Sequence, residues 1–237
     1  MVINMNEITV KLMHRKFETP LVLSPENPKL LIVENPHEFY ELVSELKRQF
    51  GGEEGDFLEV GGGNLTGDKK WELIDNPFDF GGDSKKTTSL LYKKLESTAS
   101  DGELLIVENA LRAKLSEYFY ELFDRIDMPL SFDEVCLSDI LKIGKIRFAD
   151  RDDGVLDRTV SFINAMIKLK ATRFFVFVHL KSVLSDDELQ SLYEHCALEK
   201  VGLLLIESGM ERKISEMERA TIITDDLCEI VDKNDYK

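Results

Sequence analysis

Short apolar runs and longer amphipathic stretches alternate along this chain of 237 residues. The run LLIV at residues 30–33 and the runs at residues 173–180 and 201–208 are apolar on both faces of an extended strand, and a further strand is expected at residues 220–226. Such strands typically lie inside a parallel sheet that helices cover on both sides. Helical periodicity separates them, so the sequence predicts an α/β fold with a mainly parallel sheet.

The hexapeptide LLIVEN occurs twice, at residues 30–35 and 104–109. After the first copy, Asn35 and the proline behind it are typical of a helix start, so this copy predicts a strand that leads into a helix. Ser100 and Glu103 form a capping box before the second copy, and apolar residues then recur at helical spacing. The two copies therefore predict a strand and a helix, and they do not indicate a duplicated acidic site.

The middle of the chain has the pattern of an all-α segment. Helices are expected to begin at residue 83 or 84, at residues 100–103, at the capping sequence of residues 131–134, and at residue 155. We therefore expect an α/β head domain formed by residues 1–82 and 171–237. A helical leg domain of residues 83–170 is expected to be inserted between the two parts of the head.

The formal net charge of −15 and the sequence pI near 4.8 argue against nucleic-acid binding by the chain as a whole, because lysine and arginine bind the phosphates. Binding depends on local fields, however, and basic residues gather in four places. Each cluster taken singly is also compatible with a solvated helix face. The clusters are His14, Arg15 and Lys16; Lys85 and Lys86; Lys93 and Lys94; and Lys142 with Lys145 and Arg147.

Cysteine usage gives no support for a zinc or redox motif. The three cysteines, Cys136, Cys196 and Cys228, are far apart and form no CxxC pair. This pattern fits a reducing cytosol, so we expect a cytoplasmic protein. We expect no membrane span, because no apolar run approaches the roughly 20 residues that a bilayer requires, and the N-terminus has no export signal.

A glycine-rich segment, GGNLTGDK at residues 62–69, resembles a phosphate-binding P-loop but departs from it. A P-loop has lysine directly after its second glycine, then serine or threonine, and a helix that follows. Here Asp68 separates the glycine from the lysine, and Lys70 stands in place of the hydroxyl residue. Glu207 stands at the end of an apolar strand, as does the acidic residue that assists catalysis in P-loop enzymes. His179 stands at the end of another apolar strand, with no candidate nucleophile beside it in the sequence. The pattern favours a structural loop and shows no catalytic constellation.

Carboxylates gather around the proline at residue 129, where one expected helix ends and the next begins. Several oxygens in a tight connection can converge on a hard cation, and calcium takes about 6–8 oxygen ligands in irregular geometry. The spacing is not that of an EF-hand, so helix capping and solubility are the alternative explanation. The candidate metal ligands are Asp124, Asp127, Asp133 and Glu134, and a second acidic patch contains Asp150, Asp152 and Asp153.

Three stretches carry a family resemblance: LLIVENP at residues 30–36, FDE at residues 132–134, and the run from INAMIKLK to LLLIES at residues 163–208. The last stretch has a helix, a lysine-bearing turn, an apolar strand, a helix opened by L-[ST]-x-x-E, and a strand that ends in an acid. In these stretches, and over nearly its whole length, the chain resembles the accessory adaptation protein of subtype II-A CRISPR systems, the Csn-two family.

The resemblance implies a P-loop-NTPase-like head without a functional P-loop, and a helical leg domain. It implies a non-enzymatic homotetrameric ring that threads the ends of double-stranded DNA without reading sequence. Calcium among the leg carboxylates, most directly Asp133 and Glu134, is expected to stabilise the ring, and basic residues are expected to face its lumen. The implied role is spacer acquisition, with the CRISPR integrase proteins and the effector nuclease as partners. The competing hypotheses are a nucleotide hydrolase with a degenerate phosphate-binding loop, and a purely structural scaffold.

Overall fold

The structure is a computed structural model, and it describes residues 9–65, 70–78, 85–99, 102–126, 128–148, 154–209 and 214–231. The chain divides into two compact units. The first contains Met1–Gly81 and Asp152–Lys237, and the second contains Gly82–Arg151. Within the described ranges, no helix is both long enough and apolar enough to cross a membrane.

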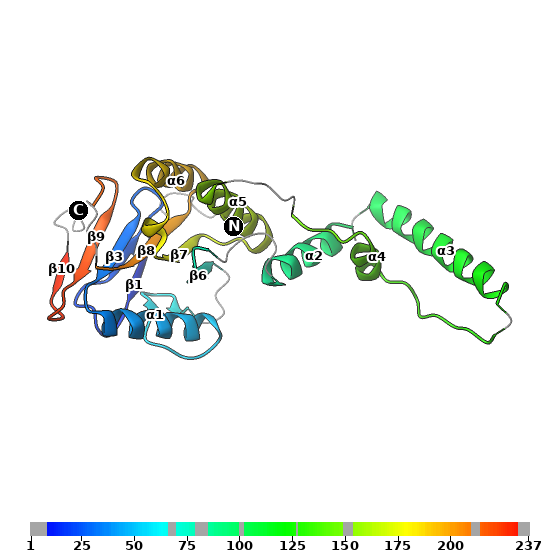
Figure 1. Ribbon diagram of the computed structural model, residues 1–237, viewed down its shortest axis with the longest axis horizontal. Coiled ribbons are helices and arrows are strands. Elements are labelled where there is room, and N and C mark those ends of the chain that lie inside the picture. The colour runs from blue at the N-terminus through cyan, green and yellow to red at the C-terminus, as the bar shows by residue number, and fades with distance from the viewer. Residues whose placement is uncertain are drawn as a thin grey trace. The chain divides into compact units, whose positions relative to one another are not determined.

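The first unit is built around a six-stranded sheet with the strand order β10-β9-β3-β8-β7-β6 (Figure 1). Its strands are β3 (Lys29–Val33), β6 (Trp71–Ile74), β7 (Phe174–Val178), β8 (Gly202–Ser208), β9 (Arg219–Ile223) and β10 (Glu229–Val231). Neighbouring strands are parallel, except that β10 runs antiparallel to β9. The mainly parallel sheet expected from the apolar runs is confirmed.

Helices cover both faces of this sheet. Figure 1 shows α1 (Pro36–Phe50) on one face, and α5 (Val155–Lys170) with α6 (Asp186–Glu199) on the other. A single 3-10 turn, η1 (Leu180–Ser182), follows β7. Because both faces are shielded from water, every residue of β3 and of β7 is buried.

The step from β3 to α1 follows from a few residues. The Asn35 side chain accepts hydrogen bonds from the backbone N–H groups of His37 and Glu38, at 3.0 and 3.2 Å, and so caps the helix. Pro36 stands at the start of the helix, where its missing N–H costs nothing. The strand and helix predicted from the first LLIVEN copy are therefore confirmed.

A smaller antiparallel sheet shares the core of the first unit. Its strand order is β2-β1-β4-β5. Its strands are β1 (Val10–Met13), β2 (Leu21–Leu23), β4 (Leu58–Glu59) and β5 (Gly63–Asn64). Buried side chains from this sheet, from α1 and from the large sheet form one cluster, which includes Leu12, Leu46, Phe57, Trp71 and Phe174. The core thus holds the two sheets and α1 in fixed relation.

The second unit contains the helices α2 (Lys85–Ala99), α3 (Glu103–Phe123) and α4 (Leu137–Ile143) among its described residues. The second LLIVEN copy forms the first turns of α3, as predicted. Ser100, the expected cap, lies outside the described residues, and Gly102 stands at the cap position without a side-chain hydrogen bond.

The helix expected to open at residues 131–134 begins later, because α4 starts only at Leu137. The Phe132 ring packs edge-on against three aromatic rings of α3, with centroids 5.0–5.9 Å apart. These rings belong to Phe119, Tyr120 and Phe123. This tertiary contact holds the segment extended and overrides the local capping signal. The cap passes to Cys136, whose N–H donates to Asp139 Oδ2 at 3.2 Å.

The division between the units differs from the expected boundaries, which placed residues 155–170 in the leg domain. Helix α5 instead covers the sheet of the first unit, where the Phe162 ring meets that of Phe175 with centroids 6.5 Å apart. Lys170 Nζ also donates to the Trp71 carbonyl oxygen at 2.7 Å and to Glu72 Oε2 at 2.8 Å. An amphipathic pattern fits a helix in the leg domain and a helix on the sheet equally well. The long-range contacts of Phe162 and Lys170 place α5 on the sheet.

Candidate functional site

The carboxyl edge of the parallel strands is where open α/β sheets usually bind ligands. At that edge, the N-terminus of α1 is filled by the side chain of Asn35. Asp225, which follows β9, accepts from Asn35 Nδ2 at 3.2 Å, and Glu34 Oε2 accepts from the Asp225 N–H at 3.2 Å. Phosphate binding at a helix N-terminus needs free N–H groups. An occupied helix end beside two carboxylates therefore disfavours the nucleotide-hydrolase alternative.

The glycine-rich segment lies elsewhere in the fold. Its described part, residues 62–65, contains β5, which pairs antiparallel with β4 in the smaller sheet, and residues 66–69 lie outside the described residues. The next described element is the strand β6, whereas a P-loop leads into a helix. The segment is therefore a connection between strands and has the wrong setting for a P-loop.

His179 and Glu207, both singled out at strand ends, lie side by side. His179 Nδ1 is 3.4 Å from Glu207 Oε2, and the Phe39 ring packs on the imidazole with centroids 4.8 Å apart. Burial raises the pKa of Glu207, although the Lys181 N–H donates to it at 2.8 Å and His179 adds a favourable charge. The contacts orient the imidazole, but they bring it no nucleophile among the described residues, so they provide no catalytic assembly.

The sequence did not indicate a buried ion pair in the first unit. Lys181 Nζ donates to both carboxylate oxygens of Glu218, at 2.6 and 2.7 Å, and the Tyr193 hydroxyl donates to the same carboxylate at 2.5 Å. Burial and the neighbouring carboxylate raise the pKa of Tyr193 well above its usual range. The sequence signal was weak: one lysine in an apolar stretch. The group anchors the segment before β9 to η1 and α6.

Most of the large apolar residues of α3 are exposed to solvent. Ile106 and Val107, from the second LLIVEN copy, are 72% and 63% exposed. Further large apolar residues exposed on α3 are Leu104, Leu105, Leu111, Tyr118, Tyr120 and Leu122. Large exposed apolar surfaces of this kind typically mark sites of protein association.

The predicted calcium ligands lie around the connection from α3 to α4. Asp124 is exposed at the end of α3, and Asp133 and Glu134 are exposed in the extended segment that follows. Glu134 Oε1 is 3.8 Å from Arg112 Nη1. In the described ranges these three do not form a group whose ligand atoms all lie within 4.8 Å. Asp127 and the patch of Asp150, Asp152 and Asp153 lie outside the described residues.

Two of the predicted DNA-binding residues, Arg15 and Lys16, are tied to carboxylates. Arg15 Nε lies 2.9 Å from Asp56 Oδ2. Lys16 Nζ contacts Glu38 and Glu41, and these contacts raise its pKa although partial burial opposes them. The positive charges of this cluster are therefore largely compensated on the surface of the first unit.

Two of the basic residues of the second unit, Lys93 and Lys94, are less compensated. Lys93 and Lys94 are exposed on α2, and neither ammonium group lies within 4.0 Å of a carboxylate in the part of the chain that the structure describes. Lys142 Nζ is 3.4 Å from Asp139 Oδ1. Lys145 and Arg147 are exposed, and the side chains of Lys85 and Lys86 lie outside the described residues.

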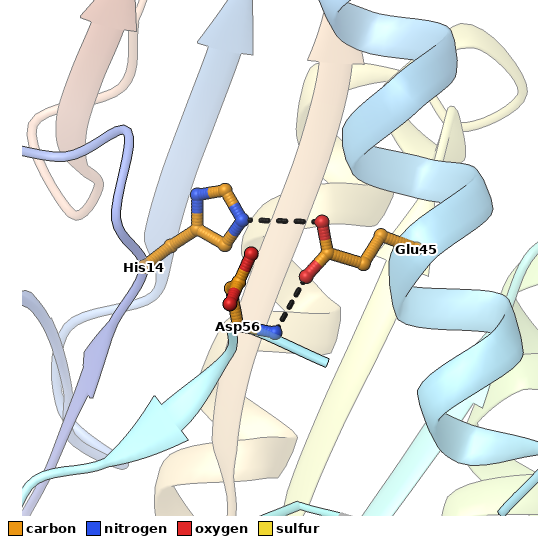
Figure 2. A group of neighbouring side chains, drawn as sticks. All are labelled: His14, Glu45 and Asp56. Atoms are coloured by element: carbon orange, nitrogen blue, oxygen red, sulfur yellow. Dashed lines mark hydrogen bonds and ion pairs between the residues drawn. The ribbon is translucent and has the colours of Figure 1, made fainter. Parts of the chain in front are cut away.

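His14, which the sequence groups with these basic residues, has a different environment. It is buried, with 1% of its surface exposed, and it meets Glu45 of α1 and Asp56, two residues before β4 (Figure 2). His14 Nε2 is 3.3 Å from Glu45 Oε2, and Glu45 Oε1 accepts from the Asp56 N–H at 2.6 Å. The Lys16 N–H donates to His14 Nδ1 at 3.2 Å. The cluster joins three segments that are distant in sequence, which is why the spacing did not indicate it.

His14 and Glu45 differ in charge at neutral pH, because their surroundings act differently on the pKa of each. Burial lowers the pKa of His14, and the hydrogen bond and charge of Glu45 only partly offset this effect. Burial acts to raise the pKa of Glu45, but the hydrogen bonds from the Asp56 N–H and from His14 bring it below its usual value. At neutral pH the cluster therefore contains a neutral imidazole beside an ionised Glu45.

Comparisons with known proteins agree with this architecture. The family model described as CRISPR-associated protein (Cas_Csn2) matches residues 49–227. The CRISPR-associated protein Csn2 of Enterococcus faecalis is 24% identical over 186 residues, which cover 77% of this chain and 83% of that protein. The crystal structure of Stu0660 of Streptococcus thermophilus aligns with a TM-score of 0.57 at 12% identity, over 92% of this chain and 75% of that one, and so shares its fold.

A mainly parallel α/β sheet with a helical unit inserted in the chain, together with a family match over most of its length, defines a CRISPR-associated protein. The chain belongs to the Csn2 family, and the resemblance stated for the Csn-two family is confirmed. Membership in this family is consistent with a role in CRISPR adaptation.

Proposed function

We propose that the chain acts in spacer acquisition as a non-enzymatic homotetrameric ring that holds the ends of double-stranded DNA without reading their sequence. The observation that carries this proposal is the exposed apolar surface of α3 in a chain of the Csn2 family. Exposure of that apolar surface to water is unfavourable for an isolated chain, and association with further copies of the chain buries the surface. The CRISPR integrase proteins and the effector nuclease are the partners we propose for the assembled ring.

Exposed lysines of the second unit supply the DNA contacts in this proposal. Lys93 and Lys94 are exposed on α2 without a described carboxylate partner, so they are available to phosphates. A tetramer presents each of them four times around one duplex, and the contributions of such weak contacts add up. An acidic chain can in this way bind DNA through a local basic surface, despite its net charge of −15.

Calcium is the cation that we propose for the carboxylates between α3 and α4. Asp124, Asp133 and Glu134 are exposed there, with Asp127 between them in sequence. Their hard oxygen donors suit calcium, which would offset their mutual repulsion and draw the segment together. Since the segment follows α3 directly, calcium would then favour the arrangement in which α3 associates.

The ring proposal is tested by native mass spectrometry in calcium and in chelator, together with gel shifts on linear and covalently closed DNA. A tetramer in calcium and a preference for linear duplex are expected. A monomer under both conditions, or equal binding to closed circles, would overturn the proposal. The double substitution Lys93→Gln/Lys94→Gln should weaken DNA binding several-fold and reduce its dependence on salt. Lys114→Gln is the control, because Lys114 of the same unit is paired with Glu117 at 2.6 Å.

A further inference from the structure

We propose that His14, Glu45 and Asp56 form a binding site in the first unit for a divalent transition-metal ion of the zinc class. Each of the three offers one ligand atom, and these atoms all lie within 4.8 Å of one another. The site is separate from the carboxylates that we propose for calcium, because those belong to the second unit. It also does not depend on the ring model.

The spacing of the donor atoms fits an ion between them. The distance of 3.3 Å from His14 Nε2 to Glu45 Oε2 is long for a hydrogen bond to a carboxylate, for which about 2.7–2.9 Å is usual when charge assists it. Two ligands that are each about 2.0–2.1 Å from a tetrahedral zinc ion lie about 3.3 Å apart. The observed separation therefore matches two ligands of one ion.

Neighbouring groups orient both carboxylates. Glu45 Oε1 is held by the Asp56 N–H at 2.6 Å, and Asp56 Oδ2 is held by Arg15 Nε at 2.9 Å. Each carboxylate thus has one oxygen fixed by a donor and a second oxygen available to an ion. Figure 2 shows the Asp56 carboxylate beside the imidazole and the Glu45 carboxylate. Supporting donors of this kind are typical of metal sites, where they fix the direction of the ligands.

The donor set favours zinc over calcium and magnesium. An imidazole nitrogen suits zinc, cobalt and nickel, whereas calcium and magnesium take oxygen ligands almost exclusively. His14 is buried against the rings of Phe17 and Phe57, at 5.2 and 4.5 Å between centroids, so it offers a ring of fixed position. The Asp56 side chain is 42% exposed, which leaves a path for the ion and for water as a fourth ligand.

Binding requires one local change. The Lys16 N–H donates to His14 Nδ1, so the neutral ring carries its proton on Nε2. An ion that takes Nε2 shifts this proton to Nδ1, with no net gain or loss, and the contact with the Lys16 amide opens. Two hydrogen bonds are lost, the one of 3.2 Å from the Lys16 N–H and the one of 3.3 Å between Nε2 and Glu45, and three metal–ligand bonds replace them.

The experiment uses the full chain after treatment with chelator, in a Cys136→Ser/Cys228→Ser background that removes the two exposed thiols as competing zinc ligands. Zinc, calcium and magnesium chlorides are compared by titration calorimetry and by thermal melting. We expect one zinc ion per chain and a higher Tm with zinc, because the ion would join the end of β1, α1 and the segment before β4. We expect neither calcium nor magnesium to bind at this site or to replace zinc in producing that rise in Tm.

The site is assigned by substitution. Asp56→Asn and Glu45→Gln should each weaken zinc binding at least ten-fold, whereas Glu41→Gln, one turn away on α1, should not. Asp56 is partly exposed, so its variant is expected to fold even if Glu45→Gln does not. Absence of zinc binding, or zinc affinity unchanged in Asp56→Asn, would show a hydrogen-bonded cluster only and overturn the proposal. Gel shifts and native mass on the same samples report the ring model separately.

Discussion

Thr221 of β9 contains a buried hydroxyl that makes no hydrogen bond among the described residues. A buried polar group without a partner has lost its hydration and gained nothing in return. Thr221→Val keeps the shape of the side chain and removes the polar atom. We expect the free energy of unfolding to rise by about 1 kcal/mol, measured by urea denaturation.

The control for that substitution is Thr159→Val in α5. The Thr159 hydroxyl is also buried, but it donates to the Val155 carbonyl oxygen at 2.7 Å. Its removal should bring no gain in the free energy of unfolding. Equal stabilisation by both substitutions would contradict the explanation from the missing hydrogen bond.

His14 predicts a dependence of stability on pH. Burial holds its pKa below the usual value of 6.5 in the folded chain, so the unfolded chain binds the proton first as the pH falls. The contribution of His14 to the free energy of unfolding is fully present above about pH 6.5, and it decreases as the pH falls from there towards the lower pKa of the folded state. Glu45, whose pKa is also lowered, continues the loss of stability below pH 4.5.

NMR titration of the His14 imidazole in metal-free protein provides the measurement. Its midpoint should lie below 6.5, and urea denaturation should show a lower free energy of unfolding at pH 5.5 than at pH 7.5. A midpoint at or above 6.5 would show that the Glu45 carboxylate outweighs burial.

At the level of single residues, the sequence indicated well which residues end a strand, but it indicated poorly which residues contact one another in the fold. His179 and Glu207 were identified as strand-end residues, and they do lie together. His14 was grouped with Arg15 and Lys16 because they are adjacent in the chain, yet its ring points into the core. The reason is that its surroundings, Phe57 and Glu45, come from other segments, and no local pattern encodes them.

Among the elements, the cap of α1 has a measurable effect. Asn35→Ala removes the acceptor for two backbone N–H groups and should lower the free energy of unfolding by about 1 kcal/mol in urea denaturation. Asn35→Ser retains a capping oxygen and should restore most of that loss. Equal destabilisation by both would assign the effect to the contact with Asp225 rather than to the cap.

The two LLIVEN copies show how far elements could be predicted. Identical letters formed a strand and a helix, and the residues flanking them distinguished the two cases correctly. The start of α4 was wrong, because Phe132 is held extended by rings of α3 that a capping motif does not report. The strand order was also beyond the sequence, since β3 pairs with β8 and β9 from the far end of the chain.

For the whole molecule, the exposed surface of α3 predicts dependence of assembly on apolar contacts. Ile106→Lys/Val107→Lys places two charges on that surface and should shift the chain towards the monomer in calcium, as measured by native mass. The thermal unfolding of the monomer should change little, because both side chains are already exposed.

Ile143→Lys provides a matched control, since Ile143 of α4 is also 72% exposed in the second unit. It should leave the oligomeric state unchanged. Loss of assembly with this substitution as well would indicate that added positive charge, rather than the α3 surface, determines association.

The two-residue connection between β3 and α1 limits how the head can change during evolution. A phosphate cradle of the GxxxxGK[ST] type needs about eight residues between strand and helix, and only Glu34 and Asn35 stand there. No point mutation supplies the missing length. Substitutions at this connection therefore cannot create such a cradle, and an insertion between strand and helix would be required.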